Sequence, residues 1–231
     1  MTLCRRRRVV GHEGVRDSMA KIHGGQIAAR QLQRAGIDTL FGVVAGPMIE
    51  LFAGGQLEGL RVIGCRHEIN AGFMASAWGW QKQRPGVLVA GSGPAVTNCI
   101  TPLYVATESA MPLVVLGGSA FSNTTGLGGF QELDQLSVAR PVCKWTGRVD
   151  STERIGEWLH LALGKALEGR PGGVYLDFPG EVVGQIVYSS TGHLIFGRSS
   201  GRAERSRSSR STSTSAPSSM QGAIGSALRP D

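Results

Sequence analysis

A Cys, an Arg, a His and a Glu stand together in GCRHEINAGFMASAWGW, which runs from Gly64 to Trp80. Glu68 lies where an apolar strand pattern changes to helical spacing. In the exposed first turn of a helix, a glutamate is stabilised as an anion by the helix dipole. In an apolar cleft, burial favours its protonated form and makes it able to exchange a proton near neutral pH. The residues alone leave both interpretations open, and we interpret His67 as a structural histidine.

Two further motifs invite a chemical interpretation. SGPAVTN, Ser92 to Asn98, follows a strand pattern and opens a helix, so its N–H groups could hold an anion, although a tight turn with a helix cap also explains it. GRSSG, Gly197 to Gly201, matches a nucleophile elbow, but a Ser/Arg-rich stretch follows where that motif needs a helix. No G-x-G-x-x-G follows the first strand and no Walker A motif occurs, so dinucleotide and ATP sites lack their usual anchors.

The net charge of +7 comes from the two ends of the chain. Residues 1–23 and residues 198–231 each carry six basic and two acidic residues, which leaves residues 24–197 close to neutral. We therefore do not expect a nucleic-acid partner for the folded part, although the basic tail could contact RNA. The four scattered cysteines and the absence of metal-ligand spacing predict a reduced, cytoplasmic chain with no metal site of its own. No apolar run is long enough to span a membrane.

Helical and strand patterns alternate about six times between residue 25 and residue 187. This alternation predicts an α/β fold with an open, mostly parallel sheet of about six strands and helices on both faces. Ligands on such sheets bind beyond the carboxyl ends of the strands. We expect a disordered basic leader over residues 1–19, one domain over residues 20–187, and a disordered Ser/Arg-rich tail over residues 188–231.

Six segments in this order resemble the N-terminal pyrimidine-binding domain of thiamine-diphosphate-dependent enzymes. They are FGVVAGPMIEL, RHEINAGFMASAWGW, RPGVLVAGSGPAVTN, MPLVVLGGS, GGFQELDQ and GRPGGVYLDFPGEV. The branch that they resemble most contains 2-hydroxyacyl-CoA lyase, oxalyl-CoA decarboxylase and acetolactate synthase. The resemblance implies thiamine diphosphate as cofactor, a small 2-oxo acid or acyl-CoA substrate, and a site shared between two chains.

The resemblance also implies roles for particular residues. Glu68 would hydrogen-bond the pyrimidine ring of the cofactor and activate it, as the catalytic carboxyl. Val44, Ala45, Gly46 and Pro47 would line the pyrimidine pocket, Phe130 would lie over the reacting carbon, and Gln131 would orient the substrate. Oxalyl-CoA decarboxylases typically carry Tyr-Glu at the last two positions, so Phe-Gln favours the lyase or synthase side. Ala71, Gly72, Ala75 and Ala77 would permit the close helix packing that a site at an interface needs.

Complete members of the family also have a domain whose GDG motif binds Mg²⁺ and the diphosphate, and no GDG occurs in this chain. We therefore expect this chain to provide only the pyrimidine half of the site, with the Mg²⁺ ligands elsewhere. Three interpretations stay open: a truncated, inactive enzyme, the pyrimidine-domain subunit of a split enzyme that needs a diphosphate-domain partner, and a non-catalytic interaction module. Of these, truncation is the expectation that we favour.

Overall fold

The computed structural model describes residues 21–188, which lie in one compact unit. The leader expected over residues 1–19, the GRSSG motif and all but the first residue of the expected Ser/Arg-rich tail lie outside the described residues.

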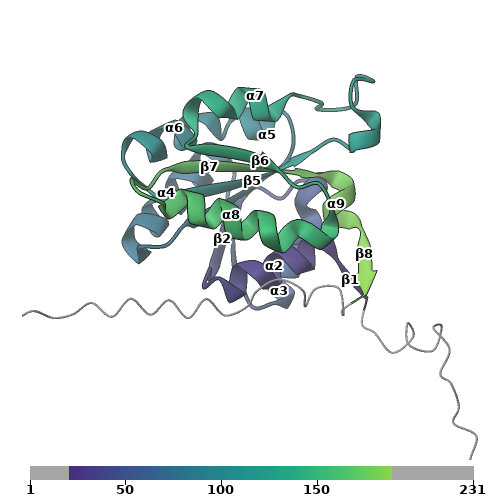
Figure 1. The fold of residues 1–231 in the computed structure, drawn as a ribbon, viewed down its shortest axis with the longest axis horizontal. Coiled ribbons are helices and arrows are strands. Elements are labelled where there is room, and N and C mark those ends of the chain that lie inside the picture. Colours follow the sequence, from purple (N-terminus) through teal and green to yellow (C-terminus); the bar gives the residue numbers. More distant parts are fainter. Residues whose placement is uncertain (1–20, 189–231) are drawn as a thin grey trace, which may run out of the picture. The chain divides into compact units, whose positions relative to one another are not determined.

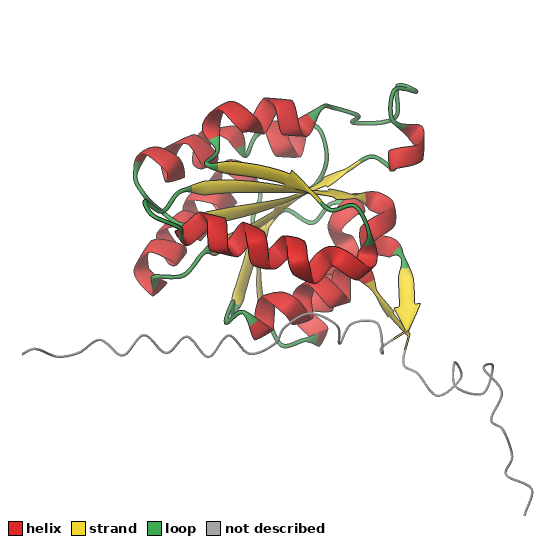
Figure 2. Cartoon of the chain, in the orientation of Figure 1, coloured by secondary structure: helices red, strands yellow, loops and turns green. Residues whose placement is uncertain are grey.

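Six parallel strands form the central sheet, in the order β3-β2-β4-β5-β7-β6. The sheet confirms the predicted fold class, and Figure 2 shows its strands between helices. Because all six strands run the same way, their carboxyl ends meet at one edge, where ligands of such sheets bind. The strands are β2 (Thr39–Gly42), β3 (Arg61–Gly64), β4 (Gly86–Ala90), β5 (Leu113–Ser119), β6 (Trp145–Arg148) and β7 (Gly173–Pro179).

Helices cover both faces of the sheet, as Figure 1 shows. On one face, α2 (Gly24–Arg34), α3 (Ile49–Leu57) and α8 (Ile155–Leu167) pack over the larger core cluster. On the other face, α4 (Glu68–Lys82), α6 (Ile100–Glu108) and α7 (Gln135–Ala139) pack over the second. The inner strands alternate between the two clusters, with Val87 and Val89 in the first and Leu88 and Ala90 in the second.

Short elements connect these helices and strands. They are η1 (Gly46–Met48), α5 (Pro94–Thr97), η2 (Ser122–Thr124), η3 (Arg140–Val142), η4 (Thr152–Arg154) and α9 (Gly180–Gly184). The 3₁₀ turn η4 leads directly into α8. None of the helices in residues 21–188 combines the length and the apolar composition that crossing a membrane requires.

A small antiparallel ribbon joins the two ends of the described chain, and the sequence patterns did not predict it. In it, β1 (Lys21–His23) pairs with β8 (Ile186–Tyr188), and Ile22 lies opposite Val187. His23 then caps α2, because its Nδ1 accepts a hydrogen bond from the N–H of Gln26 at 3.1 Å. Three-residue strands carry too little alternation to be recognised in a sequence.

The small residues of α4 mostly pack inside the domain, and their expected relation to an interface site stays a prediction. Ala71, Gly72 and Ala75 are buried, whereas Ala77 is exposed. A Cβ atom added to Gly72 would lie 2.5 Å from the Pro102 side chain of α6. The small side chains therefore let α4 lie close to α6 and to the sheet.

Candidate functional site

A large hollow of the described domain lies at the carboxyl edge of the sheet. It has a volume of about 1030 Å³, and we call it the carboxyl-edge cavity. Its wall comes from the segments that follow β2, β4 and β7, from the end of β5, and from the loop after β5. The lining residues include Ala45, Gly46, Pro47, Ser92, Ser119, Phe130, Gln131, Gly180 and Glu181.

The loop after β2 brings three predicted site residues into this cavity. Ala45, Gly46 and Pro47 line it, whereas Val44 is exposed and is not among the lining residues. Pro47 lies in the first turn of η1, where its missing N–H costs no hydrogen bond. A Cβ atom added to Gly91 would lie 2.7 Å from the Cβ of Ala45, so the glycine after β4 lets the two loops touch.

The loop that carries Phe130 and Gln131 folds around its own glutamate. Glu132 accepts hydrogen bonds from the backbone N–H groups of Gly126 and Gly129. These N–H groups, that of Gly126 most of all, hold the pKa of the Glu132 carboxyl below its ordinary value. The loop presents Phe130 with 90% of its surface exposed and places Gln131 in the wall of the cavity.

Gln131 is fixed by the turn that follows β4. The hydroxyl of Ser92 donates to Oε1 of Gln131 at 2.9 Å. Gln131 itself has a left-handed backbone with φ of 58°, a conformation that most side chains avoid. Its Nε2 has no hydrogen-bond partner among residues 21–188 and is therefore a free donor at the cavity wall.

Glu68 is the first residue of α4 and is only 9% exposed. It is thus both a first-turn glutamate and a buried one. Its Oε2 accepts a hydrogen bond from Nδ2 of Asn98 at 2.9 Å, and within the described part no residue donates to Oε1. Burial, and then the Glu68 carboxylate, raise the pKa of the neighbouring Cys99 thiol well above its ordinary range.

Glu68 is not among the residues that line the cavity, so the structure does not bring every predicted site residue together. The turn after β4 connects the two places, because Ser92 at its start holds Gln131 and Asn98 at its end holds Glu68. His67 caps α4 through a hydrogen bond from the Ile69 N–H to its Nδ1, which agrees with a structural role.

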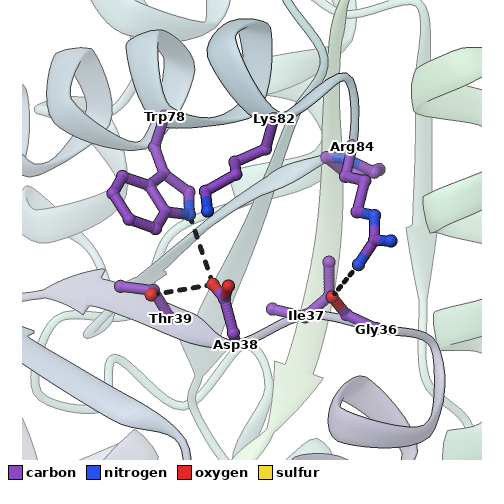
Figure 3. Close-up of a pocket in the computed structure, with 8 residues that line it drawn as sticks. Gly36, Ile37, Asp38, Thr39, Trp78, Lys82 and Arg84 are labelled. Atoms are coloured by element: carbon purple, nitrogen blue, oxygen red, sulfur yellow. Dashed lines mark hydrogen bonds between the residues drawn. The ribbon is translucent and has the colours of Figure 1, made fainter.

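A second, smaller hollow lies at the amino ends of β2 and β4. Its volume is about 220 Å³, and we call it the amino-edge hollow (Figure 3). Asp38 accepts hydrogen bonds there from Nε1 of Trp78 and from Oγ1 of Thr39. Lys82 lies over the Trp78 ring, and Arg84 donates to the Gly36 carbonyl. These side chains satisfy one another, so this hollow is the weaker candidate.

Sequence reasoning missed several groups that shape the carboxyl-edge cavity. Ser92 and Asn98 lie in the SGPAVTN turn, where the sequence suggested a role for the backbone N–H groups and not for these side chains. Gln135 and Asp177 are buried, and Nε2 of Gln135 donates a hydrogen bond to Oδ1 of Asp177. One signal was available, because Asp177 is a single acid inside the otherwise apolar strand GGVYLDFP. No group of three or more potential metal ligands comes together within residues 21–188.

Comparison with known proteins adds a family. Residues 22–138 match the model of the thiamine pyrophosphate enzyme N-terminal TPP binding domain. The chain is 37% identical over 169 residues to an oxalyl-CoA decarboxylase of Escherichia coli, which aligns with 72% of this chain and 30% of that protein. It is 35% identical over 158 residues to a probable acetolactate synthase of Mycobacterium bovis, covering 68% of this chain and 29% of that protein.

A 2-hydroxyacyl-CoA lyase of Oryza sativa is 34% identical over 189 residues, which cover 82% of this chain and 33% of that protein. The chain therefore spans about a third of the length of the curated relatives that it matches.

Proposed function

The chain belongs to the thiamine pyrophosphate enzymes as their N-terminal TPP binding domain, and from that premise we propose that it supplies the pyrimidine half of a thiamine-diphosphate site. The reaction class is that of a carbon–carbon lyase, decarboxylase or acetolactate-synthase-like enzyme. Thiamine diphosphate, when bound, provides the nucleophilic carbon and the electron sink for such chemistry. The residues of this chain bind, orient and exchange protons around it.

The observation that carries this proposal is the state of Glu68. Its carboxyl group is nearly buried, one oxygen is held by Asn98, and the other accepts no hydrogen bond from any described residue. The only fully buried side-chain oxygen or nitrogen without a partner in residues 21–188 is Oε1 of Gln31, so the free oxygen of Glu68 is still accessible to a ligand. A ring nitrogen of an aminopyrimidine can pair with this oxygen when either the carboxyl group or the ring nitrogen carries the proton between them, so the carboxyl group fits the cofactor.

Gln131 and Phe130 have roles on the substrate side of the proposed site. The free Nε2 of Gln131 can donate to a carbonyl or carboxylate oxygen of a small 2-oxo acid or an acyl thioester. The exposed ring of Phe130 can cover the reacting carbon and exclude water once a partner surface closes over it. The relatives named above include both decarboxylases and lyases, so the choice of substrate rests on the Phe-Gln pair.

We further propose that the site is completed by another chain or domain, which carries the Mg²⁺ and diphosphate contacts. The partner is either a second copy of this chain in a homodimer or a separate diphosphate-domain protein. The exposed Phe121 and Phe130 form an apolar part of the carboxyl-edge cavity wall that such a partner would cover, and the exposed Val44 directly precedes Ala45 of that wall. We expect the assembly to work in the cytoplasm.

NMR titration of the chain with the free aminopyrimidine of thiamine tests the half-site. We expect shifts at the amides of Glu68, Ala45 and Asn98. Glu68→Gln should weaken binding by about tenfold or more, because a hydrogen bond to a charged group contributes about 1.5–3 kcal/mol. Asp38→Asn, at the amino-edge hollow, is the matched control and should bind like the unmodified protein. Shifts confined to the amino edge, or equal binding by Glu68→Gln, would contradict the proposal.

Calorimetry with thiamine diphosphate and Mg²⁺ tests the claim that this chain holds only half of the site. We expect little binding by the chain alone, and tight one-to-one binding would refute that part of the proposal. Adding a diphosphate-domain protein of the same family should restore turnover, and Glu68→Gln should abolish it.

A further inference from the structure

Gln135, the first residue of α7, is a buried side chain whose two ends face different partners. It is 3% exposed. Its Oε1 accepts a hydrogen bond from the Gly93 N–H at 2.6 Å, and its Nε2 lies 3.0 Å from the Gly118 carbonyl. An N–H can only donate and a carbonyl can only accept, so chemistry fixes which end of the amide faces which neighbour. Gln135 therefore connects Gly93 to Gly118 through the two ends of its amide, and we call it the connector.

Asp177 accepts a hydrogen bond from the amide nitrogen of this connector. It is 2% exposed, and its Oδ1 lies 2.8 Å from Nε2 of Gln135 and 2.8 Å from the Tyr175 hydroxyl. Its Oδ2 accepts from the Ser119 hydroxyl at 2.8 Å and pairs with Nε of Arg148 at 3.3 Å. Burial first, and then the Asp177 charge, raise the pKa of Tyr175 well above its ordinary value, so that hydroxyl stays a donor.

Gly93, at the other end of the connector, packs against Gln131. Gly93 has φ of 54° and ψ of −109°, which L side chains rarely adopt. A Cβ atom added to it would lie 2.8 Å from the Gln131 carbonyl oxygen and 3.0 Å from its Cβ. Gly93 therefore packs closely against Gln131, while the adjacent Ser92 donates a hydrogen bond to the Gln131 amide oxygen. The Gly93 turn therefore contacts Gln131 through both its backbone packing and the Ser92 hydrogen bond.

We propose that Gln135 is a positioning residue for Gln131, acting through the Gly93 turn, with Asp177 holding Gln135 in the orientation that makes this possible. This inference rests on the proposed function only in assigning Gln131 a substrate to face. The geometric coupling itself can be measured without cofactor or substrate.

The test compares Gln135→Leu, Asp177→Asn and their double variant by amide hydrogen exchange and NMR. In Gln135→Leu we expect the Gly93 amide to exchange about tenfold faster, while core amides such as Val115 change by no more than about twofold. The side-chain Nε2 signal of Gln131 should shift as well. Because both residues act along one path, the double variant should exchange little faster than Gln135→Leu. Asp38→Asn is the matched control and should leave both signals unchanged.

Unchanged Gly93 exchange and an unmoved Gln131 signal in Gln135→Leu would overturn the inference. Uniform acceleration of all amides would also overturn it, since that would indicate a loss of stability without local coupling. Should Gln135→Leu fail to fold, Gln135→Asn keeps both polar ends but is one methylene too short to reach Gly93, and the same outcomes apply. If the unmodified chain binds no aminopyrimidine, the proposed function fails, whereas these exchange results still decide the coupling.

Discussion

The two edges of the central sheet use polar side chains in opposite ways. At the amino-edge hollow, Asp38, Trp78 and Arg84 find their partners among one another and the nearby backbone, on a partly exposed surface. At the carboxyl edge of the sheet, the deeply buried Gln135 and Asp177 are bonded to each other, while two groups nearer the surface keep one atom free. These two are Oε1 of Glu68 and Nε2 of Gln131, within the described part of the chain.

This difference indicates where binding energy can be gained. A ligand at the amino edge must break hydrogen bonds that already exist, so its net gain is small. A ligand at the carboxyl edge pairs atoms that have no partner and meets side chains that a buried network already orients, so it loses less entropy on binding. Size alone is a weaker argument, because a large hollow without convergent polar groups has no chemistry to offer.

The largest effect that separates the two edges is expected from Asp177→Ala. The change leaves the hydroxyl donors of Tyr175 and Ser119 unsatisfied, removes one acceptor of the Gln135 amide, and leaves Arg148 without its buried partner. Each buried donor left unsatisfied costs about 1–3 kcal/mol, whereas the partly exposed Arg148 can be solvated, so we expect a loss of about 2–5 kcal/mol. Urea unfolding followed by circular dichroism should register this loss in the free energy of unfolding. A loss below about 1 kcal/mol would mean that the buried network does not support the carboxyl edge.

A smaller effect is expected at the other edge from Asp38→Ala. This change removes the acceptor for Trp78 and Thr39, but water can replace an exposed carboxylate. We expect the free energy of unfolding to fall by about 0.5–1.5 kcal/mol, in the range of one net hydrogen bond. Aminopyrimidine binding at the carboxyl edge should not change. A loss as large as that of Asp177→Ala would erase the contrast between the edges.

The parts of the structure that sequence could predict are those set by local patterns. The alternation of apolar segments predicted the parallel sheet, and that sheet predicted the edge where Ala45, Pro47 and Gln131 meet. The burial of Glu68 was open in the sequence, because a first-turn glutamate and a buried one have the same residue pattern. Its separation from the cavity lining depends on how far α4 lies from the loop after β5, which no pattern encodes.

The Gln135 to Asp177 contact was beyond sequence reasoning for a related reason. The two residues are 42 positions apart, and their meeting depends on β7 lying beside β5. Strand order in a parallel sheet follows from packing of the whole domain, so a single sequence gives no direct signal for it. The lone acid in an apolar strand indicated that Asp177 needed partners, but not which ones.

The smallest effect concerns a charged contact away from both edges. The guanidinium of Arg30 in α2 donates to both carboxylate oxygens of Glu58, which follows α3, at 3.0 and 2.8 Å. That hydrogen bond, more than any other cause, lowers the pKa of Glu58 below its ordinary value of 4.5. A carboxyl with a lowered folded-state pKa stabilises the fold fully above its unfolded-state pKa, and the contribution is lost as the pH falls through the folded-state value.

Glu58→Gln should therefore lower the free energy of unfolding by about 0.5–1 kcal/mol at about pH 7, since partly exposed ion pairs contribute little. At about pH 3 the variant and the unmodified protein should approach equal stability, because the glutamate is increasingly protonated in both states. Urea unfolding at the two pH values measures the difference, with Asp38→Asn unfolded in parallel as a carboxyl-to-amide control at the amino edge. If the difference in the free energy of unfolding grew as the pH fell, the prediction would be wrong. A difference that stayed constant with pH would mean that the Glu58 side chain stabilises the fold through packing and not through its charge. The charges that stabilise this domain would then be mainly the buried ones at the carboxyl edge.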